Sequence, residues 1–211
     1  MRIGKMGRAL LGWMLAAGAV AGQIPRIPMP VEYENSAEYS WLNKKVLEAR
    51  TLDDLSDPSR WSLKGQGRLS FLRTGAEPRY ARVEVDVHGV PAEAGPSAAP
   101  SATLVRDFPG EDWTPFNRLY FRVRPQMSGF HVLTLVVRLR SDGVEKTPDI
   151  YGREGGHYLT LANHRWTDIA WEITPLGRDK VTSLEFHCRV PKRLAAPGDS
   201  VTFEIGPIEL Q

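Results

Sequence analysis

The chain has 211 residues, with 27 Lys and Arg against 25 Asp and Glu, 42% hydrophobic residues and a single cysteine. This length and apolar content are sufficient for one well-packed domain. One cysteine excludes an intrachain disulfide scaffold and a cysteine-based zinc site. The near balance of charges provides no concentrated basic surface, so we do not expect nucleic acid as a partner.

Residues 1–21 have the features of a secretory signal peptide. Three basic residues precede an apolar run over residues 9–20, and Ala19-Val20-Ala21 fits the small-x-small rule for cleavage. The run is short for a membrane span. We therefore expect cleavage near Ala21, a secreted or periplasmic protein, and no membrane contact after cleavage; a retained membrane anchor is the alternative.

Residues 22–51 are expected to form a proline-rich linker or strap. Three prolines between positions 25 and 30 favour extended polyproline II structure. The spacing of Leu42, Val46 and Ala49 fits a short amphipathic helix, although Val46-Leu47 also fits the start of a strand.

Residues 52–211 carry the pattern of an all-β domain. Apolar and polar residues alternate in segments of the kind that forms half-buried strands, at residues 67–73, 79–88, 119–124, 133–140, 169–173, 184–190 and 201–205. No helical pattern separates consecutive segments, so the seven or eight expected strands predict an antiparallel β-sandwich. Residues 91–101, rich in Ala, Pro, Ser and Gly, should be an excursion between strands.

Four motifs in this region resemble those of galactose-binding-like jelly-roll modules, which are appended to polysaccharide-degrading enzymes. They are the opening Leu52-Asp53-Asp54-Leu55 with Trp61, the strand Asp112 to Val123, the segment Arg165 to Trp171, and the closing Val201 to Leu210. The resemblance implies a jelly-roll sandwich that serves as a secreted, non-catalytic accessory domain, binding carbohydrate or bracing a catalytic domain. The final strand runs to the end of the chain, which we expect of a module preceding a catalytic domain.

The same resemblance implies a structural calcium ion between the first and last strands. The carboxylates that correspond are those of Asp53, Asp54, Asp57 and Glu209. Gly206 stands where such modules usually carry a further aspartate, which puts this site in doubt. No other cofactor is expected.

Polar residues on the outward phase of three strands are the main candidates for carbohydrate binding. If the three strands are neighbours, they form one arginine-rich face that suits an anionic or hydroxyl-rich glycan. The alternative is a solvated face or one covered by another domain. The candidates on these strands are Tyr120, Arg122, Arg138, Arg140, His187 and Arg189.

The segment from Thr147 to Tyr158 provides a second group of candidates. Its three glycines permit turns that lift side chains off a rigid scaffold. The candidates are Tyr151, Arg153, His157 and Tyr158. A long hairpin whose tyrosines pack on their own strands is the alternative.

Tryptophans are the other residues able to stack on sugar rings. Trp171 is in phase with the apolar residues of its segment and is expected in the core. Trp61, Trp113 and Trp166 lie at segment edges, where they either close the ends of the sandwich or stack on a ligand.

Motifs for catalysis are weak. The five histidines lack metal-ligand spacing, no GxSxG nucleophile motif is present, and Cys188 alternates with apolar residues as a buried side chain would. A jelly-roll polysaccharide lyase remains an alternative, with Tyr151 or Tyr158, His157 and an arginine around one uronate. A purely structural domain is the third alternative.

Overall fold

The structure is a computed structural model that describes residues 48–75, 78–88, 100–128, 133–145, 157–190 and 199–211. The expected signal peptide and most of the expected linker lie outside these residues, as do Tyr151 and Arg153. Within the described residues, regular structure begins with a strand at Arg50. No helix in this part of the chain is long and apolar enough to cross a membrane.

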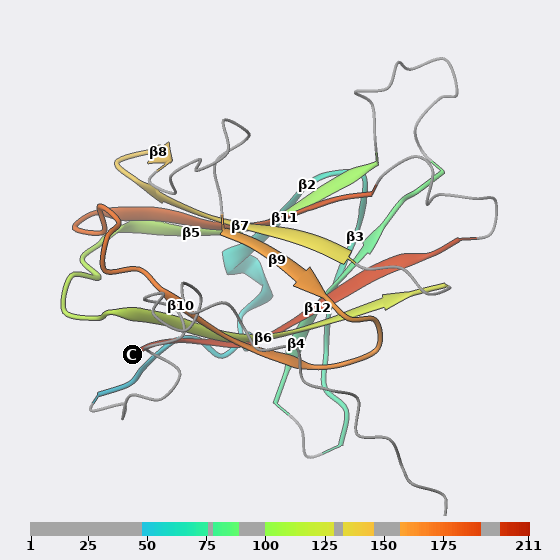
Figure 1. The fold of residues 1–211 in the computed structure, drawn as a ribbon, viewed down its shortest axis with the longest axis horizontal. Helices are drawn as coiled ribbons and strands as arrows, with labels where there is room; N and C mark the ends of the chain where they lie inside the picture. The colour runs from blue at the N-terminus through green and yellow to red at the C-terminus, as the bar shows by residue number, and fades with distance from the viewer. Residues whose placement is uncertain (1–47, 76–77, 89–99, 129–132, 146–156, 191–198) are drawn as a thin grey trace, which may run out of the picture.

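The domain is an antiparallel β-sandwich of two six-stranded sheets, which lie as two layers in Figure 1. Sheet A has the order β10-β6-β12-β4-β3, with β1 also paired to β12. Its strands are β1 (Arg50–Asp53), β3 (Gly67–Leu72), β4 (Tyr80–Val85), β6 (Arg118–Met127), β10 (Thr167–Glu172) and β12 (Val201–Leu210).

Sheet B has the order β2-β5-β11-β7-β8, with β9 also paired to β7. Its strands are β2 (Trp61–Gly65), β5 (Ser101–Glu111), β7 (Leu133–Ser141), β8 (Val144–Glu145), β9 (His157–Leu161) and β11 (Val181–Arg189). A 3-10 turn, η1 (Pro58–Arg60), precedes β2.

The core lies between the sheets and follows the alternation in the sequence. On β6 the side chains of Leu119, Phe121 and Val123 are fully buried, and Phe121 packs edge-on against Phe186 of the facing sheet, with ring centroids 5.2 Å apart. Burial of apolar side chains from both inner faces is the main stabilising contribution in such a sandwich. The outward residues of the same strands are thereby left to form the two outer faces.

Several expectations from the sequence are confirmed by this core. The antiparallel β-sandwich is present, Trp171 is buried with 6% of its surface exposed, and Cys188 is fully buried. Trp61 and Trp113 are buried as well, whereas Trp166 is half-buried.

Candidate functional site

The outward polar residues singled out in the sequence do not share one face. Tyr120 and Arg122 lie on β6 in sheet A, whereas Arg138 and Arg140 lie on β7 in sheet B. The expectation of a single arginine-rich face is therefore wrong. Alternation along one strand identifies a side chain that points outward, but the sheet in which it lies depends on long-range pairing.

The outer face of sheet A, here called the Trp166 face, is built around a buried carboxylate. Glu204 of β12 points outward and yet has no exposed surface. Arg82 of β4 donates to its Oε1 from Nε at 2.9 Å and from Nη2 at 2.7 Å, and Arg124 of β6 donates to its Oε2 from Nε at 2.5 Å. Charge-assisted bonds of this kind compensate the loss of solvent around a buried carboxylate.

Two aromatic rings lie against this carboxylate and its two arginines. The Arg124 guanidinium lies 4.6 Å from the centroid of the Trp166 ring and 5.9 Å from that of Tyr80. The two rings meet edge-on, with centroids 6.1 Å apart and an interplanar angle of 77°. Cation–π and edge-to-face contacts of this geometry fix the orientation of both rings.

Next to this cluster, Asp168 of β10 links two outward side chains of β6. It accepts a hydrogen bond of 2.8 Å from the Tyr120 hydroxyl and an ion pair of 2.9 Å from Arg122 Nε. Burial and the contact with Asp168 raise the pKa of Tyr120 to about 12. The phenol is therefore a hydrogen-bond donor at neutral pH and not a nucleophile or base.

The outer face of sheet B, here called the Tyr158 face, contains an open row of side chains. Register pairs Tyr158 of β9 with Val136 of β7, Val136 with His187 of β11, and His187 with Thr103 of β5. Tyr158 is 38% exposed, and the Thr103 hydroxyl lies 2.8 Å from His187 Nδ1. The row thus joins an exposed ring to an imidazole and a hydroxyl.

Charged groups continue this face beside the row. Arg138 lies two residues from Val136 on the same side of β7, opposite Glu185 of β11. Arg140, the next outward residue of β7, donates from Nε to the Glu185 carboxylate at 2.8 Å. Arg189 is exposed at the end of β11. The structure therefore brings Arg138, Arg140, Tyr158, His187 and Arg189 onto one face.

His157, a further candidate from the sequence, is not on this face. Its ring stacks on Trp171 of sheet A, with centroids 5.0 Å apart and planes 10° from parallel. Adjacent residues of a strand point to opposite faces, so His157 points inward where Tyr158 points outward. The expectation that His157 belongs to a raised binding loop is wrong. Of the two tyrosines in the lyase alternative, Tyr158 points away from His157, and Tyr151 lies outside the described residues.

The four carboxylates expected to bind calcium have separate partners. Glu209 of β12 lies opposite Thr51 of β1 and accepts a hydrogen bond of 3.2 Å from the Gln211 side-chain amide. Asp53 is buried, accepts from Arg106 Nε at 2.6 Å and caps the amide of Leu55 at 2.8 Å. Asp54 and Asp57 accept bonds from residues two positions further on, which lower the pKa of both carboxyls. Among the described residues no three Asp, Glu, His or Cys side chains are grouped as a metal site. Calcium binding stays a prediction.

Two residues of the Trp166 face escaped the sequence analysis. Glu204 lies on the outward phase of its strand, so its sequence position predicts an exposed side chain. Its burial could not be predicted, because the arginines that bind it are more than 70 residues away in sequence. Tyr80 likewise lies at the outward start of a strand, and only the fold places it against Trp166. The alternation along each strand shows that both side chains point outward. No local pattern in the sequence indicates that Glu204 and Tyr80 lie in one cluster with Trp166 and the arginines.

The sequence matches no family model and no curated protein. Among solved structures, the chain is similar to the family 11 carbohydrate-binding module from Clostridium thermocellum in complex with a β-1,3-1,4-mixed-linked tetrasaccharide. The TM-score is 0.50 and the identity 14%, over 79% of this chain and 96% of that one. This similarity establishes the jelly-roll fold expected from the sequence motifs.

Two further structures match with lower scores. The C-terminal family 22 carbohydrate-binding module of Clostridium thermocellum Xyn10B has a TM-score of 0.44 and 12% identity, over 75% of this chain and 90% of that one. An agarase has a TM-score of 0.49 and 9% identity, over 77% of this chain and 24% of its own.

Proposed function

We propose that this domain is a non-catalytic carbohydrate-binding module that holds a glycan on the Tyr158 face. The observation that carries the proposal is the exposed ring of Tyr158 in one cross-strand row with His187 and Thr103. Proteins bind sugars by stacking an aromatic ring on the apolar side of the sugar and by donating hydrogen bonds from planar polar groups. The row and the adjacent arginines provide both.

The shape of this face favours the interior of a polysaccharide over a chain end. From Tyr158 to Thr103 the row crosses three strand spacings, or about 14 Å. Such a length accommodates several consecutive sugar residues. The similarity in fold to a module seen with a mixed-linked tetrasaccharide supports a linear glycan as the ligand.

An accessory role follows from the same chemistry. His157 points inward and Tyr158 outward, so the version of the lyase alternative that joins these two side chains on one uronate has no support. A binding domain that does not cleave its ligand can hold a linked catalytic domain close to the polymer. We therefore propose that the domain belongs to a secreted protein that degrades polysaccharides. The signal-peptide features of residues 1–21 support secretion.

Affinity electrophoresis and calorimetry with the domain test this proposal. The panel contains mixed-linked β-glucan and xylan. We expect Tyr158→Ala to weaken binding about tenfold, because loss of one stacked ring removes about 1.4 kcal/mol. Tyr158→Phe keeps the ring and should stay within about threefold of the wild type.

Tyr120→Phe is the matched control, since it removes a tyrosine hydroxyl from the opposite sheet. It should leave the affinity for these polymers unchanged. Wild-type protein with a cooperative thermal transition and no affinity for any polymer of the panel would overturn the proposal in favour of a purely structural domain. Unchanged affinity in Tyr158→Ala would also overturn it.

A further inference from the structure

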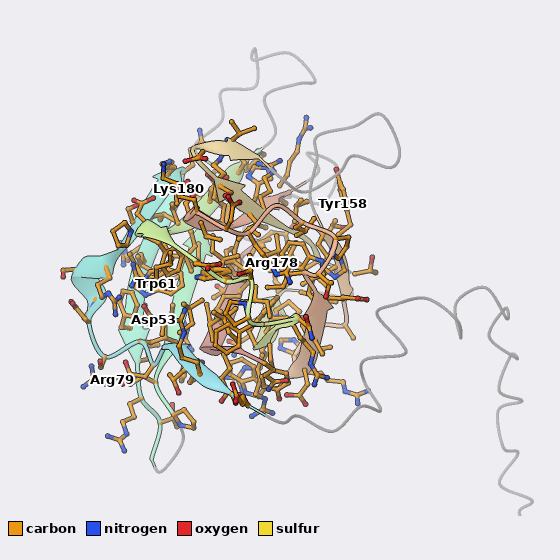
Figure 2. The ribbon with its side chains drawn as sticks, turned by 90° about the vertical axis from the view of Figure 1, so that its left-hand side faces the viewer. Asp53, Trp61, Arg79, Tyr158, Arg178 and Lys180 are labelled. Atoms are coloured by element: carbon orange, nitrogen blue, oxygen red, sulfur yellow. The ribbon has the colours of Figure 1, made fainter. Side chains whose placement is uncertain are left out.

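A small pocket on the Trp166 face, opposite the proposed glycan surface, has a chemistry of its own. It is lined by two aromatic residues, Tyr80 and Trp166, two arginines, Arg79 and Arg122, and the small residues Pro78, Gly206 and Pro207. In Figure 2, Arg79 marks this side of the molecule and Tyr158 lies on the other side. We infer that this pocket binds one sugar residue that bears a carboxylate or a sulfate.

The hollow arises from the pairing of β12. Its residues Val201–Ile205 pair with β4, whereas Ile208–Leu210 pair with β1, so Gly206 and Pro207 fall between the two partners. The register with β6 also shifts between Ile205 and Ile208, as in a β-bulge. Gly206 has no side chain and Pro207 has a short one, so this junction leaves space above the backbone.

The walls are arranged before any ligand arrives. Trp166 is held by Arg124, whose guanidinium is bonded to the buried Glu204, and by the edge-on contact with Tyr80. Because Glu204 fixes Arg82 and Arg124 from below, the two rings have little freedom to move. Rings fixed in this way bind a sugar face without a further loss of side-chain entropy.

The charge around the pocket favours an anion. The residues that line the pocket include two arginines, Arg79 and Arg122, and no aspartate or glutamate. Beside and beneath the pocket, Asp168 pairs with Arg122, and Glu204 pairs with Arg82 and Arg124. Arg122 contacts Asp168 through Nε, and its guanidinium carbon lies 5.4 Å from the centroid of the Trp166 ring. Arg79 donates to a backbone carbonyl, that of Ser56, at 3.2 Å.

These features select the ligand class. The half-buried ring of Trp166 matches the apolar side of a pyranose ring, and Tyr80, which is only 5% exposed, supports it edge-on. The guanidinium groups of Arg79 and Arg122 match a planar or tetrahedral anionic substituent. A neutral sugar would form no ion pair with these two guanidinium groups. The site is therefore complementary to a uronate or a sulfated sugar, whereas the Tyr158 face has its own row of groups for the glycan proposed above.

Calorimetric titrations with trigalacturonate, a chondroitin sulfate tetrasaccharide and cellotetraose test the inference. We expect binding of at least one of the two anionic saccharides at this pocket, and the two arms distinguish carboxylate from sulfate. Arg122→Ala should weaken that binding about tenfold, because it removes the charge-assisted bonds. Raising NaCl from about 50 to about 500 mM should also weaken it, since the pocket is open to solvent.

Asp168→Asn is expected to change the affinity for the anionic saccharide in the opposite direction. It removes the carboxylate that competes for Arg122, and we expect about threefold tighter binding of the anionic saccharide. Arg68→Ala is the matched control, because Arg68 is an exposed arginine on the outer face of the same sheet, opposite Glu84. It should leave the affinity unchanged.

Binding at this pocket can be distinguished from glycan binding on the Tyr158 face. Tyr158→Ala should bind the anionic saccharide as tightly as the wild type. Absence of binding by trigalacturonate and by the sulfated tetrasaccharide would overturn the inference, as would equal loss in Arg122→Ala and Arg68→Ala. Neither outcome bears on binding of a neutral glycan by the opposite sheet.

Discussion

At the scale of single residues, Glu204 combines full burial with a position on an outer face. Its two oxygens are held by Arg82 and Arg124, whose side chains are 28% and 23% exposed. The hydrogen bond to Glu204 raises the pKa of Arg82. Because the arginines remain partly hydrated, loss of the carboxylate should cost less than the 3–5 kcal/mol typical of a broken pair in a fully buried site.

We predict that Glu204→Gln lowers the free energy of unfolding by about 1–3 kcal/mol. Chemical denaturation measures the change. Glu84→Gln is the control, because Glu84 is an exposed outward residue on the neighbouring strand and should change stability by less than about 0.5 kcal/mol. Equal effects of the two substitutions would contradict the role assigned to Glu204.

Cys188 is a second residue whose chemistry is set by its surroundings. It is fully buried on the inner side of β11, and this burial raises the pKa of its thiol to about 12. The thiolate is the reactive form. The native thiol is therefore inert near neutral pH.

We predict that Ellman's reagent labels Cys188 at least about 100-fold more slowly in the native protein at pH 8 than in guanidinium chloride. The thiolate forms more readily in the unfolded chain, where the pKa is about 8.5. This group therefore lowers the free energy of unfolding as pH rises above that value. Rapid labelling of the native protein would show that Cys188 is accessible.

At the scale of elements, the chain changes sheets within a single residue between β2 and β3. Gly65 ends β2 in sheet B and Gly67 begins β3 in sheet A. Gly65 has φ +92°, and a Cβ there would lie 2.5 Å from the carbonyl oxygen of Ser101. Gln66 links the sheets by donating its amide to that oxygen and accepting from Asp86.

We predict that Gly65→Ala destabilises the domain by about 2–4 kcal/mol, because both the backbone conformation and the steric contact oppose a side chain. Gly75→Ala tests the effect of the backbone conformation alone. Gly75 also has a positive φ, of +59°, but a Cβ there would meet no atom within 4 Å. Gly75→Ala should lower the free energy of unfolding by about 1–2 kcal/mol, measured by denaturant unfolding.

The alternation of polar and apolar residues predicted where strands lie in the sequence better than it predicted which strands pair with one another. The polar and apolar phases of β6, β7 and β11 are those expected from the sequence. The sheet to which each belongs was not predictable, because β6 pairs with β10 and β12, which follow it by dozens of residues. For the same reason, the inward position of His157 was missed at the start of a short strand.

At the scale of the whole molecule, the two sheets are joined by polar as well as apolar contacts. Asp53 of β1 in sheet A pairs with Arg106 of β5 in sheet B, and both side chains are buried. Sequence resemblance assigned Asp53 to a metal site. In the structure this carboxylate binds the guanidinium of Arg106, which alternation places inside the sandwich, and no spacing rule connects two residues so far apart in the chain.

Because the sheets lie back to back, the Tyr158 face and the Trp166 face point in opposite directions (Figure 1). With the packed core about 10 Å thick, one molecule occupied on both faces would stand between two polymer strands and tie them together. If both proposed sites were filled at once, the domain would cross-link two polysaccharide chains into a network whose stiffness depends on the ratio of protein to polymer. Excess protein would saturate both polymers separately and dissolve the network again.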